Sequence, residues 1–225
     1  MGELTKDLVE RSYRDKLRIL LILYFFSDEI DEKEDMNPTY VRVFKSEVRI
    51  QKIDFLIRYP DYLSFELLNL LENDKVSYSK NDIKNHVKNI FNSNEPEFRR
   101  DEMHRYFFGA YEEIDHIILF LEAYGFIKYK SRKNVSGKIF DKIYYLTEFG
   151  VDKIEHGILK NSNKVNWYRD RCVLIKTYFG DLSGSELKVR QYEHKEYRTT
   201  PINEYIKGIQ EGVKSKYFEI FKEEL

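Results

Sequence analysis

Residues 121–150 read LEAYGFIKYKSRKNVSGKIFDKIYYLTEFG, and this stretch is the most informative part of the chain for the fold. Its first residues close an apolar helix, which a glycine ends. Residues 126–132 alternate apolar and polar side chains, as a half-buried strand does. A turn of Asn, Val, Ser and Gly leads to a second strand at residues 139–146, so the two strands are predicted to form a hairpin. Thr147 is expected to cap the helix that follows.

This order of elements resembles the recognition helix and wing of MarR- and PadR-type winged helix-turn-helix proteins. The resemblance implies a helix lying against the core, a chain reversal at Gly125 and a two-stranded wing beside the helix. We therefore expect a mainly α protein with a small β-hairpin: a winged helix-turn-helix core with N- and C-terminal helical extensions. The expected regions are an N-terminal helical arm with an acidic linker (1–36), the winged-helix-like domain (37–160) and a C-terminal helical extension (161–225).

Apolar residues at helical spacing predict that most of the remaining chain is helical. Pro60 is expected to stop one helix and Asp61 to cap the next. A short β-like stretch precedes them at residues 39–44. The expected helices cover residues 6–26, 47–59, 61–73, 81–91, 97–108, 111–124, 148–158, 165–179 and 202–224.

Composition places the chain among intracellular globular proteins. It has 225 residues, 42% of them hydrophobic, and a formal net charge of −1, so it is not a globally basic nucleic-acid binder. The single cysteine, Cys172, excludes an internal disulfide and a cysteine-based zinc site. The longest apolar run, residues 19–26, is too short to span a membrane and is not followed by a signal-peptide cleavage site. We expect a cytoplasmic protein.

The predicted wing is locally basic, with one acid, Asp141, among its cations. Such a hairpin can lie on the phosphate backbone of DNA, where contacts position a protein without reading sequence. A solvated hairpin whose lysines prevent edge-to-edge pairing explains the same residues. The residues expected at the phosphate backbone are Lys128, Lys130, Arg132, Lys133 and Lys138.

The helix predicted before the wing, residues 111–124, argues against readout of DNA sequence. It has no Lys, Arg, Asn or Gln, and its carboxylates would be repelled by phosphates. We expect it to face protein. The residues expected to contact a partner are Tyr111, Glu112, Asp115, Trp167, Tyr205, Ile209 and Tyr217.

Motifs of catalysis are missing from the sequence. It has no glycine-rich phosphate loop, no GxSxG and no HExxH, and its five histidines are scattered. Glu113 and His116 form one isolated ExxH, whereas di-iron bundles need such motifs in pairs. We therefore expect no enzymatic activity, no cofactor, no metal and no small-molecule substrate.

Two longer stretches carry a family resemblance. NPTYVRVFKSEVRIQKIDFLIRYPDYLSFELL (37–68) and WYRDRCVLIKTYFGDLSGSELKVRQYEHKEYRTTPINEYI (167–206) resemble the middle subunit of bacterial ABC-three-component, Lamassu-type, defence systems against phages and plasmids. The resemblance implies a non-catalytic subunit beside an SMC-like ATPase and an effector that is commonly a nuclease. The alternative is a PadR- or MarR-like transcription regulator, and an SMC-like ATPase gene next to this one would favour the first interpretation.

Overall fold

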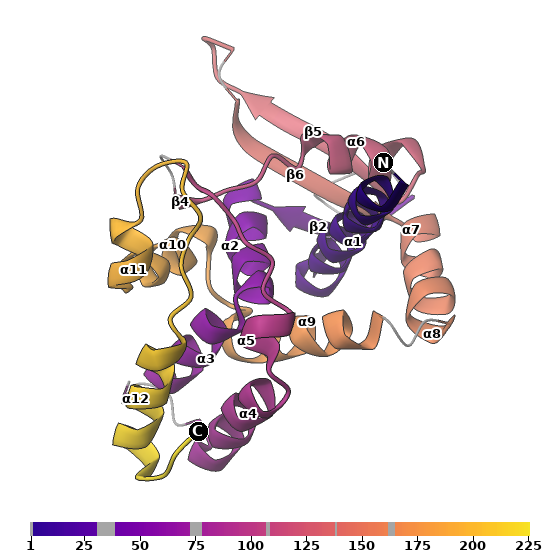
Figure 1. Ribbon diagram of the computed structural model, residues 1–225. Helices are drawn as coiled ribbons and strands as arrows, with labels where there is room; N and C mark the ends of the chain where they lie inside the picture. The colour runs from indigo at the N-terminus through magenta and orange to yellow at the C-terminus, as the bar shows by residue number, and fades with distance from the viewer. Residues whose placement is uncertain (1, 31–38, 73–77, 107–108, 138, 162–164) are drawn as a thin grey trace. The chain divides into compact units, whose positions relative to one another are not determined.

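The computed structural model describes residues 2–30, 39–72, 78–106, 109–137, 139–161 and 165–225, and it is mainly helical with a small antiparallel sheet (Figure 1). The chain forms two compact units, each built from two separate segments. The first unit comprises Met1–Asp54 and Glu113–Leu187, and the second comprises Phe55–Glu112 and Lys188–Leu225. This grouping differs from the three consecutive regions expected from the sequence. The N-terminal helix is not a separate arm, because its residues 19–23 are buried in the core of the first unit.

The first unit contains the four-stranded antiparallel sheet, in the order β1-β2-β6-β5. The predicted hairpin is confirmed, since β5 and β6 pair in register from Ile127 opposite Leu146 to Arg132 opposite Asp141. β6 also pairs with β2, which adds the strand that lies before α2 in the sequence. The strands are β1 (Asp28–Glu29), β2 (Tyr40–Lys45), β5 (Ile127–Lys133) and β6 (Ile139–Thr147). Most of the acidic linker falls at residues 31–38, outside the described residues.

The helices of the first unit pack around α1, whose buried residues 19–23 contribute to the core. α1 contacts both α6 and α9. Arg18 on α1 is almost fully buried and pairs with the equally buried Asp54 on α2, so this charge is compensated inside the unit. The helices are α1 (Gly2–Phe26), the first part of α2 (Glu47–Arg58), α6 (Asp115–Ala123), α7 (Glu148–Asp152), a π-helical turn (Lys153–Ile158), α8 (Leu159–Asn161), α9 (Asn166–Phe179) and the start of α10 (Gly184–Glu193).

The junction of hairpin and α7 depends on two residues. Thr147 caps α7 as predicted, because its hydroxyl accepts the amide of Gly150 at 2.9 Å. The same hydroxyl donates to the carbonyl of Gly125 at 2.6 Å, at the reversal between α6 and β5. A Cβ at position 150 would overlap the carbonyl of Phe126. The Thr-Glu-Phe-Gly sequence therefore lets the chain after β6 pass directly against the chain before β5.

The second unit is helical around a core of buried tyrosines. Tyr59, Tyr62, Tyr197 and Tyr217 are all fully buried. Their hydroxyls bond to the backbone or to acids: Tyr59, for example, donates to the carbonyl of Ile206 at 3.0 Å and accepts an amide at 2.9 Å. Burial raises the pKa of Tyr59 to about 12. The elements are the end of α2, α3 (Pro60–Asn69), a 3₁₀ turn (Leu70–Glu72), α4 (Lys80–Asn92), α5 (Glu95–Phe98), β3 (Arg105–Tyr106), β4 (Gly109–Ala110), the rest of α10, α11 (Lys195–Thr199) and α12 (Gln210–Phe221).

Three predicted helices are wrong in whole or in part. Over residues 97–106, the described part of the helix expected at 97–108, the chain is the end of short α5 followed by extended chain, where Arg58 binds the carbonyls of residues 101 and 102. Residues 107 and 108 lie outside the described ranges. The helix expected at 202–224 begins only at Gln210. Residues 203–206 pair instead with residues 103–106, with His104 bridged to Tyr205. The helix expected at 111–124 begins at Asp115, after strand β4.

Pro60 also acts differently from the expectation. It occupies the first turn of α3, where the missing amide hydrogen costs nothing, and so it starts a helix as well as ending α2. Asp61 does not cap α3; Tyr59 is in that position. The buried Asp61 carboxylate accepts the amide of Tyr62 at 3.0 Å and that of Ile209 at 2.5 Å. Burial is the main reason that its pKa is raised.

Candidate functional site

The exposed face of β5 carries the cations that the sequence predicts at a phosphate backbone. Along the strand, Lys128, Lys130 and Arg132 are exposed at alternate positions, and Lys133 is exposed at its end. The intervening residues are buried or half-buried, as the alternation requires. Figure 1 shows the hairpin extending beyond α6. Lys138 lies outside the described residues, so the structure does not place it.

Lys128 is paired within the unit. Its ammonium lies 2.8 Å from the carboxylate of Glu122, on the last turn of α6. The hydrogen bond and the charge of Glu122 raise the pKa of Lys128 above its ordinary value. The same carboxylate also accepts the amide of Tyr129 at 3.4 Å. Glu122 is therefore held over the start of β5.

Lys142 on β6 is paired in the same way. It contacts Glu47 at the start of α2, and its ammonium lies 3.1 Å from Asp115, the first residue of α6. Burial alone would lower the pKa of Lys142, but the two carboxylates outweigh it, and the pKa is raised. Two of the hairpin's cations are thus neutralised by carboxylates of α2 and α6.

The three other described cations of β5 keep a large exposed surface. The Lys130 ammonium lies 4.7 Å from the centre of the Tyr145 ring and 5.3 Å from that of Tyr40, in cation–π contact. Arg132 has a side chain that is 65% exposed and lies 3.9 Å from Asp141, at the limit of an ion pair. With Lys133, these residues form what we call the wing patch: Lys130, Arg132 and Lys133.

α6 lacks the side chains that most often read DNA bases. Its nine residues, DHIILFLEA, include no Lys, Arg, Asn or Gln. Leu119 and the following Tyr124 are each 63% exposed, so part of its outer face is apolar. Glu112 and Glu113, which the sequence analysis placed on this helix, precede it. The shorter helix still has none of the Lys, Arg, Asn and Gln side chains that most often read bases.

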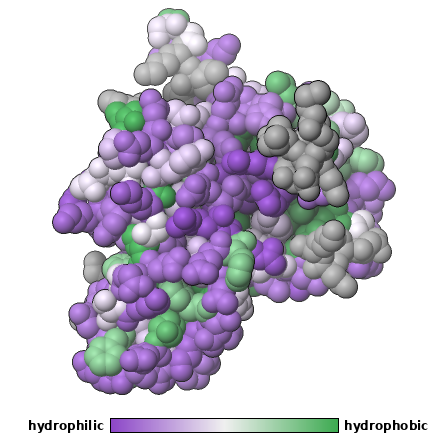
Figure 2. All heavy atoms as spheres, in the orientation of Figure 1, coloured by the Kyte–Doolittle hydropathy of each residue, from purple (hydrophilic) through white to green (hydrophobic). Residues whose placement is uncertain are grey.

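The predicted partner-contact residues divide into exposed and buried ones. Tyr205 is 51% exposed and Asp115 is exposed, while Tyr111 and Trp167 are half-buried. Glu112 is half-buried and bound to the buried Arg58 within the second unit. Two assignments are wrong: Tyr217 is fully buried and Ile209 nearly so. Both side chains face the core of the second unit. On the face drawn in Figure 2, hydrophilic side chains dominate and hydrophobic ones form small separate patches.

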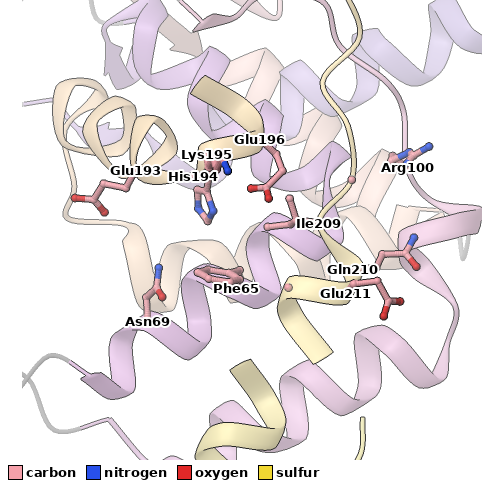
Figure 3. Close-up of a pocket in the computed structure, with 12 residues that line it drawn as sticks. Phe65, Asn69, Arg100, Glu193, His194, Lys195, Glu196, Ile209, Gln210 and Glu211 are labelled. Carbon is pink, nitrogen blue, oxygen red and sulfur yellow. The ribbon is translucent and has the colours of Figure 1, made fainter. Parts of the chain in front are cut away.

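The sequence analysis missed a pocket in the second unit (Figure 3). It has a volume of about 580 Å³, and Phe65, His194 and Ile209 lie around its centre. The buried carboxylate of Glu66 lies 2.6 Å from His194 Nε2 and 2.6 Å from Arg190 Nε, which fixes the imidazole. The charged lining residues are Arg100, Glu193, Lys195, Glu196 and Glu211. Because these have both signs, the pocket does not select a ligand by charge.

In the described ranges, no three or more His, Cys, Asp or Glu side chains are grouped so that they could hold a metal ion. Within the same ranges, no helix has the length and apolar composition needed to cross a bilayer. Cys172 is buried, and burial raises the pKa of its thiol.

No protein-family model, no curated protein and no solved structure matches the chain.

Proposed function

We propose that this chain is a non-catalytic winged-helix subunit that contacts the phosphate backbone of duplex DNA through its wing. Support for the winged helix comes from the first unit, whose order is α1, β2, α2, α6 and the β5–β6 hairpin. β2 pairs with β6, so a strand from before α2 completes the sheet that the hairpin begins. In this interpretation α6 is the recognition-type helix, and residues 59–112 are inserted in the sequence between α2 and α6.

The observation that carries the DNA proposal is the contrast between β5 and α6. The wing patch presents three exposed cations, whereas α6 presents carboxylates, apolar side chains and one histidine, His116, and no Lys, Arg, Asn or Gln. Cations that meet phosphates bind any sequence and lose affinity with salt. The contact is therefore non-specific.

We further propose that the chain works in the cytoplasm as an accessory subunit of an anti-phage or anti-plasmid complex, with neither cofactor nor membrane contact. It would bridge an SMC-like ATPase and a nuclease-type effector. This assignment rests on the resemblance of residues 37–68 and 167–206 to the middle subunit of Lamassu-type systems. The exposed Leu119 and Tyr124 on and beside α6 supply apolar surface for such a partner.

Co-expression with the genes that flank it tests the subunit proposal. The expected result is a stable complex in gel filtration that contains this chain, an SMC-like ATPase and an effector. A chain that elutes alone in the presence of those partners would contradict it.

Selection from random duplexes separates this function from the transcription-regulator alternative. We expect no enriched motif, and a clear palindromic site would favour the regulator.

A further inference from the structure

The end of α6 and the start of β5 place a carboxylate on a wing lysine. α6 ends at Ala123, and Gly125, with φ of +77°, reverses the chain into β5. This reversal brings Glu122 to 2.8 Å from the Lys128 ammonium. The Glu122 side chain is 22% exposed and also accepts the Tyr129 amide, whereas Lys128 is 53% exposed. The acid is held in place, and the lysine reaches back to it.

A phosphate and the Glu122 carboxylate would compete for the same ammonium. The negative charge of Glu122 opposes a phosphate at Lys128, so a phosphate contact there is favoured when that ion pair opens. Lys142 differs, because it is only 19% exposed and two carboxylates hold it. Of the two lysines that carboxylates of α2 and α6 hold, Lys128 is exposed enough to exchange partners.

We infer that Glu122 restrains DNA binding by the wing, as an internal substitute for phosphate on Lys128. The inference rests on the proposed function, since it concerns the regulation of the same surface. With the pair closed, the wing patch supplies three phosphate contacts, and with the pair open, Lys128 supplies a fourth. Each added contact steepens the plot of log affinity against log salt concentration by about 0.9.

The test measures binding of the full chain to a random-sequence duplex between about 50 and about 200 mM salt, the range over which phosphate contacts dominate affinity. Glu122→Gln should bind roughly fivefold more tightly at low salt and show a slope steeper by about 0.9, because one more counterion is released. Glu113→Gln is the matched control. Glu113 is exposed just before α6, and its loss changes the net charge equally without touching Lys128.

A second variant shows whether the effect acts through the lysine. The extra slope should disappear in Glu122→Gln/Lys128→Ala. The inference is overturned if Glu122→Gln and Glu113→Gln have the same slope, or if the steeper slope persists without Lys128. Reversal of the wing patch to Glu distinguishes the two failures. If that reversal abolishes binding while Glu122→Gln keeps the wild-type slope, the restraint is wrong and the wing contact stands. If neither the wild type nor Glu122→Gln binds duplex, both proposals fail.

Discussion

The carboxylate of Glu66 lies 2.6 Å from Nε2 of His194, and both side chains are buried in the second unit. The contact joins α3 to the start of α11. Burial alone would raise the pKa of Glu66. The hydrogen bond from His194 and the charge of Arg190 outweigh burial, so the pKa lies below its ordinary value. Glu66 is therefore a buried charge that its partners stabilise.

Glu66→Gln should destabilise the protein by about 2 kcal/mol, because the charged acceptor of two hydrogen bonds is lost inside the unit. Chemical denaturation at neutral pH measures the free energy of unfolding. Glu193→Gln is the control, since Glu193 is exposed on α10 beside the same pocket. Equal stability of the two variants would show that the network around His194 contributes nothing.

Gly150→Ala should destabilise the protein by roughly 2–3 kcal/mol, because the added methyl overlaps a backbone carbonyl that cannot move aside. Gly157→Ala is the matched control in the same unit, where a Cβ would meet no atom within 4 Å. Thermal unfolding of both variants checks the prediction. A Gly150→Ala protein as stable as the control would mean that the chain after β6 does not pass against Phe126.

Acid should remove the stabilisation that Glu223 provides. Hydrogen bonds from Lys84, Lys88 and Tyr217 lower its pKa from the ordinary 4.5 to about 2. A pKa lowered by folding stabilises the folded state fully above the ordinary value, and this contribution is lost as the pH falls from 4.5 to about 2. The melting temperature of Glu223→Gln should therefore lie below that of the wild type at neutral pH.

The two melting curves should converge as the pH approaches about 2, where the wild-type carboxylate is also protonated. Glu219→Gln, an exposed change on the preceding helix α12, should follow the wild type throughout. A difference between Glu223→Gln and the wild type that stayed constant with pH would contradict the assigned ion pairs.

Local patterns predicted the hairpin well, because strand alternation, a turn and the Thr147 cap all lie within residues 121–150. They failed at residues 97–108 and 202–224. Ile206 and Ile209 have helical spacing, yet residues 203–206 pair with residues 103–106. Because the two segments are about a hundred residues apart, the sequence of neither one shows that they pair.

The ion pairs of the hairpin were likewise not predictable from the local sequence. The sequence identified a basic strand but not which lysines are neutralised. Glu122 and Lys128 are six positions apart, and their contact depends on the reversal at Gly125. Lys142 meets Asp115 and Glu47, which are far from it in the sequence. A tally of charges thus predicted five phosphate contacts, and one of these five residues, Lys128, is held by a carboxylate of α6.

Reversal of the wing patch tests the DNA proposal most directly. The variant Lys130→Glu/Arg132→Glu/Lys133→Glu is compared with the wild type in binding unrelated duplexes at low and high salt. A control with Lys195, Lys207 and Lys214 changed to Glu, all exposed in the second unit, lowers the net charge equally. We predict that the wing variant loses binding to every duplex alike, most strongly at low salt, while the control keeps most of its affinity. Binding by the wing variant that equals the wild type at low salt would contradict the account and leave the wing a solvated hairpin.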